Sequence, residues 1–178
     1  MATSLYFNKE QYNWTIEAVE YAEDLVKYFY QMAYRDWQGL YYDVKTLADL
    51  QIHEITDQAF AQLARYEMTM PGGSRRTETT EFYRICIQDH KILDAIENRE
   101  DGISFRPLVL YIVTHELIHI IRFGKLLKWY EIPSGSEAEE ARVHKVTGQI
   151  LKNINMPGLE KVLDSYQVYS IARNDLSN

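Results

Sequence analysis

The chain has 178 residues, and 19 Lys and Arg against 26 Asp and Glu give it a formal net charge of −7. Hydrophobic residues make up 46% of it and charged residues 25%, which is typical of a globular protein and excludes disorder for most of the chain. An acidic chain without a Lys/Arg-rich block repels phosphate backbones, so we expect no nucleic-acid partner.

The length predicts a single domain over residues 1–178. The only cysteine, Cys86, cannot form a disulfide within the chain, which fits a reducing compartment. The first eleven residues show no basic segment followed by an apolar run, so no secretory signal is predicted. We therefore expect a cytoplasmic protein.

Helices are expected in the N-terminal part of the chain, over about residues 8–65. From Asn8 to about Trp37, apolar residues recur at helical spacing, which predicts one long or two shorter amphipathic helices. A second helical stretch is expected over about residues 44–65, with a break near residues 51–53.

A small antiparallel hairpin or sheet is predicted next, over about residues 66–88. Pro71 and the two glycines after it form a turn signal. Residues 82–87 can form a strand with Tyr83, Ile85 and Ile87 on one face. A short helix is expected over residues 91–98.

The most apolar stretch, about residues 104–123, predicts the central helix of the fold. Pro107 in its first turn and Gly124 just past its end are start and stop signals. Polar residues interrupt the apolar run, so we expect no membrane span. Two further helices are predicted over about residues 137–152 and 157–171. The expected fold class is therefore α+β and mainly helical.

Residues 115–119, inside the predicted central helix, read H-E-x-x-H. A spacing of four places His115 and His119 on one helix face, about 5–6 Å apart at Cβ, where both imidazoles can reach one metal ion. Glu116 points to the side of that pair and can contact water at the ion. Burying these three groups in an apolar helix costs several kcal/mol unless they find partners, and a divalent cation with its water satisfies all three.

Two other interpretations use the same residues. In the first, His115 and His119 are hydrogen-bonded core histidines without a metal. In the second, Glu116 and His119 form the E-x-x-H of a di-iron helical bundle, which needs a second E-x-x-H. No other histidine of the chain has a glutamate three residues before it. The second copy is therefore missing.

A catalytic zinc site needs a third protein ligand and an open position for water. The predicted helix over residues 137–152 begins with three glutamates and is where we expect that ligand. Glu140 and His144 project from one face of it, among small residues that allow another helix to approach closely. We take Glu140 as the third ligand, and the alternatives are Glu139, Glu137 and His144.

The motif, followed by a glutamate on a later helix, resembles the gluzincin metallopeptidases, the zincins typified by thermolysin. In thermolysin nineteen residues separate the second histidine from the ligand glutamate, and that count falls here on Glu139. Glu140-Ala141 instead resembles the start of the E-A-x-x-F-A segment of the ImmA/IrrE family. The resemblance covers about residues 115–144.

The chain also departs from both families. Gluzincins carry an acidic residue four positions after the ligand glutamate, but Val143 and His144 stand at that distance from Glu139 and Glu140. His144 and Lys145 replace the aromatic residue and the alanine of the ImmA/IrrE segment.

The resemblance implies a zincin-like fold in which a strand, expected at residues 82–87, borders the substrate cleft. It implies a zinc-dependent protease for peptide or protein substrates, with Zn2+ held by His115, His119 and Glu140 and with Glu116 as catalytic base. The side chains that could also stabilise the oxyanion are His144, Tyr130, Arg142 and His90. The alternative function is a non-catalytic zincin-like domain that binds metal and acts in protein–protein interaction.

Overall fold

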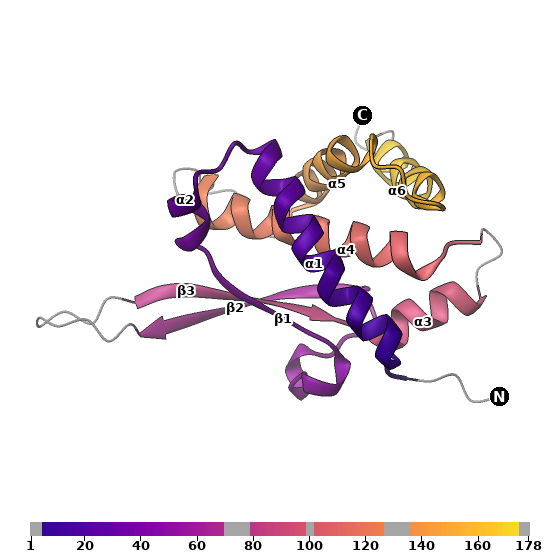
Figure 1. Cartoon of the computed structure of the whole chain (residues 1–178), viewed down its shortest axis with the longest axis horizontal. Coiled ribbons are helices and arrows are strands. Elements are labelled where there is room, and N and C mark those ends of the chain that lie inside the picture. The colour runs from indigo at the N-terminus through magenta and orange to yellow at the C-terminus, as the bar shows by residue number, and fades with distance from the viewer. Residues whose placement is uncertain (1–4, 70–78, 99–101, 127–135, 175–178) are drawn as a thin grey trace, which may run out of the picture.

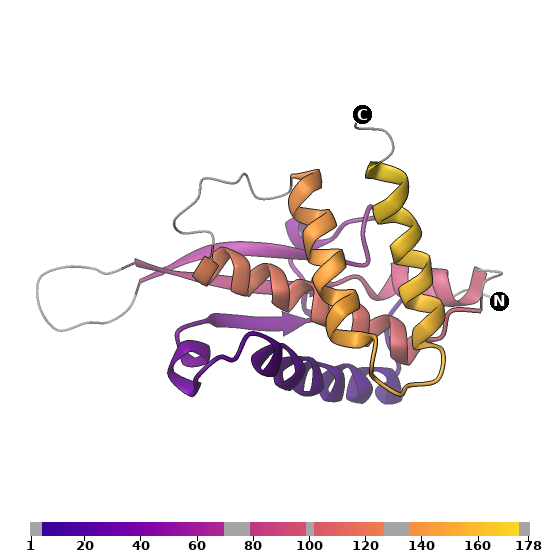
Figure 2. The ribbon, with the colours of Figure 1, turned by 90° about the horizontal axis from the view of Figure 1, so that it is seen from above.

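The computed structural model describes residues 5–69, 79–98, 102–126 and 136–174. A small sheet forms one layer, and helix α4 (Phe105–Ile121) lies across it (Figure 1). Helix α1 (Lys9–Phe29) packs against α4. Helices α5 (Glu137–Leu151) and α6 (Leu159–Asn174) pack together on the side of α4 away from the sheet (Figures 1 and 2). The fold is α+β and mainly helical, as predicted.

Helix α1 begins at a capping box. The Asn8 side chain accepts a hydrogen bond from the Gln11 backbone N–H, and the Gln11 side chain accepts one from the Asn8 N–H, both at 2.9 Å. Its buried stripe includes Ala18 and Ala22, whose small side chains allow α1 to approach α4 closely. The chain turns after α1, where Gln31 has φ 50°, and the short helix α2 (Tyr34–Gln38) follows. This region therefore forms two helices, one of the two predicted arrangements.

The sheet has three strands in the order β1-β3-β2, and their bounds are β1 Tyr41–Lys45, β2 Ala61–Thr69 and β3 Thr79–Ile87. Strand β1 is parallel to β3, whereas β2 is antiparallel to it, with Leu63 opposite Ile85. The alternate β3 residues predicted to share a face are all buried: Tyr83, Ile85 and Ile87.

The helix predicted over residues 44–65 is wrong. These residues form the end of β1, the start of β2 and, between them, the 3-10 turns Leu47–Asp49 and Ile52–Glu54. Two side chains just after β3 hold this segment: the Asp89 carboxylate accepts from the Leu47 N–H and the Gln88 amide oxygen from the Thr56 N–H, both at 3.0 Å. These contacts come from residues distant in sequence, and they pair backbone N–H groups that would be paired within a helix if one formed. The helix propensity of residues 44–65 therefore does not decide their conformation.

The predicted antiparallel hairpin is correct in part. Strands β2 and β3 are antiparallel, but β2 starts at Ala61, before the predicted boundary at residue 66. The parallel strand β1 was not predicted and makes the sheet mixed. Because β3 pairs on both sides, residues 82–87 lie in the centre of the sheet, and β2 is an edge strand.

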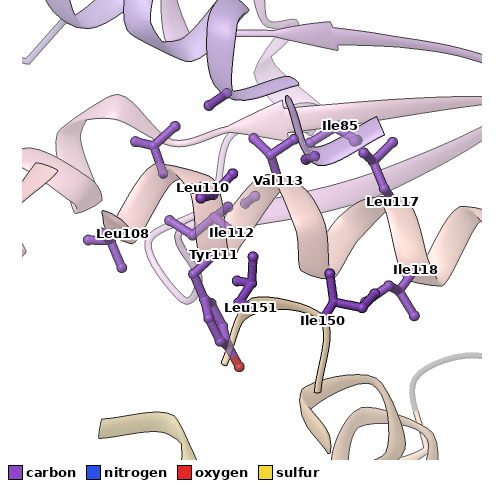
Figure 3. Close-up of a cluster of buried hydrophobic side chains, with 14 of the residues drawn as sticks. Ile85, Leu108, Leu110, Tyr111, Ile112, Val113, Leu117, Ile118, Ile150 and Leu151 are labelled. Atoms are coloured by element: carbon purple, nitrogen blue, oxygen red, sulfur yellow. The ribbon is translucent and has the colours of Figure 1, made fainter. Parts of the chain in front are cut away.

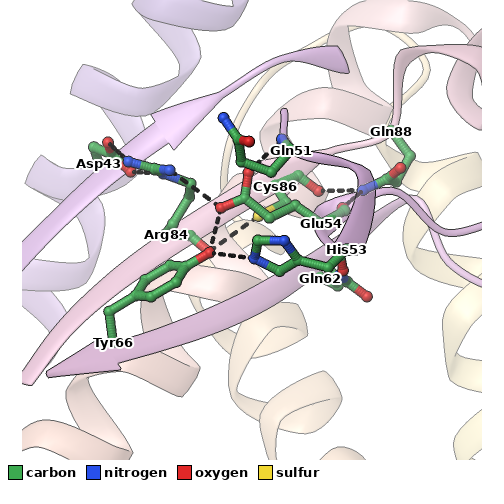
Figure 4. Close-up of polar contacts among 9 residues, drawn as sticks. All are labelled: Asp43, Gln51, His53, Glu54, Gln62, Tyr66, Arg84, Cys86 and Gln88. Carbon is green, nitrogen blue, oxygen red and sulfur yellow. Dashed lines mark hydrogen bonds and ion pairs between the residues drawn. The ribbon is translucent and has the colours of Figure 1, made fainter. Parts of the chain in front are cut away.

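A polar cluster covers the face of the sheet opposite the helices (Figure 4). The Arg84 guanidinium donates to both carboxylate oxygens of Asp43 at 2.8 Å and to Glu54 at 3.1 Å. The Tyr66 hydroxyl also donates to Glu54, whose carboxylate is fully buried. Glu54 lies in the second 3-10 turn, so this cluster fastens the segment before β2 to the sheet.

Helix α3 (Asp89–Asn98) leads to α4, around which the hydrophobic core is built (Figure 3). Every residue of α4 from Pro107 to Ile121 is buried. A helix that is apolar on all sides is stable in water only when other elements surround it. The apolar composition of this stretch predicted such an enclosure. It is provided by contacts with α1, α3, α5, α6 and two strands.

Two helix ends differ from their predictions. Gly124 lies inside a π-helical turn (Arg122–Leu126) that extends α4, and a Cβ there would lie 2.8 Å from Leu40 Cδ2. The last helix begins at Leu159 rather than at residue 157, because Gly158 adopts φ 83°, which favours glycine.

Within the described residues, one stretch is long and apolar enough to cross a membrane by length and composition, Phe105–Gly124 with mean hydropathy 1.2. In this fold 89% of that stretch is buried inside the protein. Core helices of water-soluble proteins pass the same test, so the stretch is weak evidence for a membrane span.

Candidate metal centre

A cleft of about 1030 Å³ opens beside α4, and residues of β2, α3, α4, α5 and α6 line it. On α4 the cleft-lining residues lie three to four positions apart, which places the buried His115, Glu116 and His119 on the side of the helix that faces the cleft. Glu140 and His144, one turn apart on α5, line the same cleft. The cleft therefore brings the motif together with part of the predicted ligand helix.

Three side chains converge in this cleft. The Nε2 atoms of His115 and His119 are 3.1 Å apart. One oxygen of the Glu140 carboxylate lies 3.1 Å from Nε2 of His119, and the other lies 3.4 Å from Nε2 of His115. Among the described residues these three form the group of donors that could hold a metal ion.

The donor separations fit zinc. Ligands placed tetrahedrally at 2.0–2.1 Å from a zinc ion lie about 3.3–3.4 Å from one another. The three observed separations, 3.1, 3.1 and 3.4 Å, are within a few tenths of an ångström of that value. Two imidazole nitrogens and one carboxylate are also a donor set that zinc prefers, and they leave one position of a tetrahedron for water.

The two buried imidazoles direct the same ring atom, Nε2, at one place. His115 and His119 are 8% and 5% exposed, and their Nδ1 atoms, which face away from that place, are buried without a hydrogen-bond partner among the described residues. Their Nε2 atoms face each other and Glu140. Without a cation, only protons shared among these three side chains could form hydrogen bonds there. A cation is the simpler partner for three donors that point to one place.

The carboxylates of the site have opposite electrostatic surroundings. Hydrogen bonds from His115 and His119 hold the pKa of Glu140 well below its usual range. Burial raises the pKa of Glu116. Burial also acts to lower the pKa of His119, but the hydrogen bond to Glu140 and the nearby charge of Glu116 outweigh it and raise that pKa. One carboxylate is thus suited to bind a cation and the other to accept a proton.

Glu139, the alternative ligand at the thermolysin spacing, points elsewhere. It is 2% exposed and forms a two-pronged ion pair with Arg122, in which Nη2 and Oε2 are 2.9 Å apart. Glu137, another alternative, is exposed at the start of α5 and does not line the cleft. Neither side chain therefore faces the two histidines.

His144 lies at the edge of the donor cluster. Its Nε2 is 4.0 Å from a Glu140 oxygen, and its ring centroid is 4.4 Å from that of His115. The Tyr111 hydroxyl lies 2.7 Å from His144 Nδ1, and the Tyr166 ring stacks on both residues. The ring thus lies beside the cluster without being one of the three donors in the metal-binding group.

Two of the other candidates for oxyanion stabilisation do not line the cleft. His90 pairs with Asp57 at 2.9 Å, and neither His90 nor the exposed Arg142 lines the cleft. Tyr130 lies outside the described residues. Of the four candidates, His144 is thus the one that the described residues place at the site.

Sequence reasoning did not identify Tyr111, Tyr166 or Arg122 as site residues. Tyr111 carries a usable signal, because it precedes His115 by one helical turn. Tyr166 and Arg122 carry none, since only the packing of α4, α5 and α6 brings them to the site.

The strand that borders the cleft is β2 rather than the predicted strand at residues 82–87. The Gln88 N–H donates to the Phe60 carbonyl at 2.8 Å, which makes these opposed residues a hydrogen-bonded pair of the antiparallel ladder. The alternation of that ladder then turns the backbone N–H and C=O groups of Ala61, Leu63 and Arg65 away from β3, toward the open edge.

Comparisons of the chain with protein-family models, with curated proteins and with solved structures find no match. The interpretation of the site therefore depends on its own geometry and chemistry.

Proposed function

We propose that the protein is a zinc-dependent metallopeptidase of zincin type. The observation that carries the proposal is the convergence of His115, His119 and Glu140 at tetrahedral separations in an open cleft, with the buried Glu116 beside them. A purely structural zinc site is closed by four protein ligands, whereas this group has three and faces a cleft of about 1030 Å³.

His115, His119 and Glu140 would hold the ion. A zinc ion so held lowers the pKa of water and polarises a carbonyl group. Glu116 accepts a proton from the water that adds to the scissile carbonyl carbon, and it then passes this proton to the leaving amine as the C–N bond breaks. The products are a carboxylate and an amine. Burial raises the pKa of Glu116, which makes its carboxylate a stronger base.

The scissile carbonyl oxygen gains negative charge during this step and needs a hydrogen-bond donor. Burial raises the pKa of the Tyr111 phenol, so it keeps its proton, and its hydroxyl lies 2.7 Å from Nδ1 of His144. We take the phenol as the donor in this contact. A neutral imidazole that accepts at Nδ1 carries its proton on Nε2, which faces the donor cluster. His144 is therefore our choice for the oxyanion donor.

An extended peptide would bind along β2. The backbone groups of Ala61, Leu63 and Arg65, which have no partner strand among the described residues, offer a ladder of hydrogen bonds beside the cleft. A peptide that pairs with this edge lies next to α4 and so passes the metal donors.

A second candidate, a non-catalytic metal-binding domain for protein–protein interaction, is favoured by the 4.0 Å approach of His144 Nε2 to Glu140. If His144 became a fourth ligand, it would close the site. The 4.0 Å between His144 Nε2 and Glu140 exceeds the 3.1–3.4 Å that separate the three proposed ligand atoms from one another, so the ring lies outside the tetrahedral spacing. This spacing favours the enzyme.

The test combines zinc content with peptide cleavage. Wild type is expected to bind one zinc ion and to cleave members of a broad peptide pool, as read by mass spectrometry. Glu116→Gln should keep the zinc and lose cleavage, because it removes the base and leaves the ligands. A wild type that binds zinc and cleaves no peptide would favour the interaction domain, and one without zinc affinity would exclude both functions.

A further inference from the structure

We propose that the buried ion pair between Arg122 and Glu139 positions Glu140 and so determines how tightly the site binds zinc. Neither residue belongs to the donor group itself. The inference rests on the proposed metal site and extends it to two residues that act through a third.

The pair connects the two ligand-bearing helices beside the ligands themselves. Arg122 follows His119 by three residues at the end of α4, and Glu139 directly precedes Glu140 in the first turn of α5. A contact at this point controls the distance and rotation of α5 relative to the two histidines.

Glu139 is held at both its backbone and its side chain. The Ser136 hydroxyl, at the N-cap of α5, accepts a hydrogen bond from the Glu139 N–H at 3.2 Å. The carboxylate accepts two hydrogen bonds from the planar Arg122 guanidinium, which fixes its direction as well as its distance. Both side chains are almost fully buried, at 7% and 2% exposed.

The direction of Glu139 determines that of Glu140. Adjacent residues of an α-helix point about 100° apart, because a turn contains 3.6 residues. With Glu139 directed at Arg122, the next side chain is directed toward the cleft, where it meets His115 and His119. A rotation of α5 would carry both glutamates away from their partners together.

Simple helix attachment does not require these charges. Replacing a buried ion pair by apolar residues of similar volume is often neutral or stabilising, whereas removal of one partner is strongly destabilising. Apolar side chains would hold α4 and α5 together but would not fix the rotation of α5 about its own axis. The directional contact between the guanidinium and the carboxylate fixes that rotation.

The test is the double variant Arg122→Met/Glu139→Leu, which exchanges both charges for apolar side chains. Its melting temperature should equal or exceed that of wild type, since no unpaired charge remains. Its affinity for Zn2+, measured by competition with a chromophoric chelator, should fall about 10- to 100-fold, the usual cost of losing a positioning partner.

A matched control separates positioning from general loosening. Leu151→Ala creates a cavity at the buried C-terminal end of α5, far along the helix from Glu139. It should lower the melting temperature and, well below that temperature, leave the zinc affinity within about threefold of wild type. The double variant should therefore lose zinc affinity and keep its stability, whereas Leu151→Ala should lose stability and keep its zinc affinity.

The outcomes are distinguishable. A double variant that binds zinc as tightly as wild type would overturn the positioning role and leave the proposed function intact. Equal losses of affinity in the double variant and in Leu151→Ala would also overturn it, because loosening alone would then explain both. A wild type without zinc affinity would refute the metal site itself. Should the double variant fail to fold, Arg122→Lys keeps the charge but not the two-pronged contact, and an unchanged affinity there would overturn the inference.

Discussion

The hydroxyl of Tyr111 lies 2.7 Å from Nδ1 of His144, and it joins the motif helix to the helix that carries Glu140. With the phenol as donor in this contact, as we propose, His144 carries its proton on Nε2 and can donate it to a substrate. As a donor at Nε2, His144 complements the proposed base and metal ligands.

His144→Phe should lower kcat about 10²- to 10³-fold, the usual cost of losing one oxyanion donor. KM and zinc content should stay near the wild-type values, because the lost interaction forms only as charge develops on the carbonyl oxygen. Steady-state kinetics with zinc analysis measure both effects. His144→Gln, which retains an N–H at about the Nε2 position, is the control and should keep more activity.

A loss of zinc from His144→Phe would show that the ring is a ligand, contrary to this prediction. Unchanged kcat in a zinc-loaded variant would equally contradict it.

Glu140→Ala should abolish tight zinc binding, whereas Glu137→Ala should leave it unchanged. Both residues lie in the first turn of α5, but only Glu140 lies within 3.1–3.4 Å of the two histidine nitrogens. Chelation of wild type should lower its melting temperature, because a ligand that binds only the folded state stabilises that state. Calorimetry of each protein with and without zinc provides the measurement. Equal zinc affinities in the two variants would rule out Glu140 as a ligand.

Arg65→Pro should weaken peptide binding with little further loss of stability beyond Arg65→Ala. The Arg65 N–H points to the open edge of β2, so proline there removes a donor for the peptide and none for the sheet. Ala64→Pro is the matched comparison, since the Ala64 N–H belongs to the ladder with Arg84, and it should destabilise the fold by about 1–3 kcal/mol through the lost ladder hydrogen bond. Peptide KM and urea unfolding report the two effects. Wild-type KM in Arg65→Pro would argue against pairing at this edge.

Glu54→Gln should reduce the dependence of stability on acid pH. Burial acts to raise the pKa of Glu54, but hydrogen bonds from Tyr66, the Gln51 N–H and Arg84 outweigh it and lower the pKa to about 2 from an ordinary 4.5. A carboxyl with a lowered folded-state pKa stabilises the fold above its unfolded-state pKa, and this contribution is lost as pH falls from about 4.5 toward 2.

Wild type should therefore exceed Glu54→Gln in stability at neutral pH, and the difference should shrink with acidification. Urea unfolding from pH 7 to pH 3 measures it. A difference that stays constant over this range would mean that Glu54 has no lowered pKa.

The patterns read correctly from the sequence depend on local geometry. The apolar run around Val113 and Leu117 predicted a buried central helix because no partly exposed helix could be so apolar, and α4 is buried from Pro107 to Ile121. The strand face of Tyr83, Ile85 and Ile87 followed from the alternation of side chains along a strand.

The helix predicted over residues 44–65 failed for the opposite reason. Its residues can form a helix locally, but Gln88 and Asp89 bind the backbone of this segment from the far end of β3. Strand β1 also pairs in parallel with a strand far along the chain. Such long-range contacts leave no periodic pattern in the sequence of residues 44–65, although they determine the conformation of that segment.

The motif alone predicts the pairing of His115 with His119, since residues one helical turn apart lie together wherever the helix is placed. The choice between Glu139 and Glu140, in contrast, depends on how α5 packs against α4. The two glutamates have the same chemistry and adjacent places on one helix, so no local rule separates them. Arg122, seventeen residues before Glu139, forms an ion pair with the Glu139 carboxylate. In the rotation of α5 that this contact favours, Glu140 faces the two histidines.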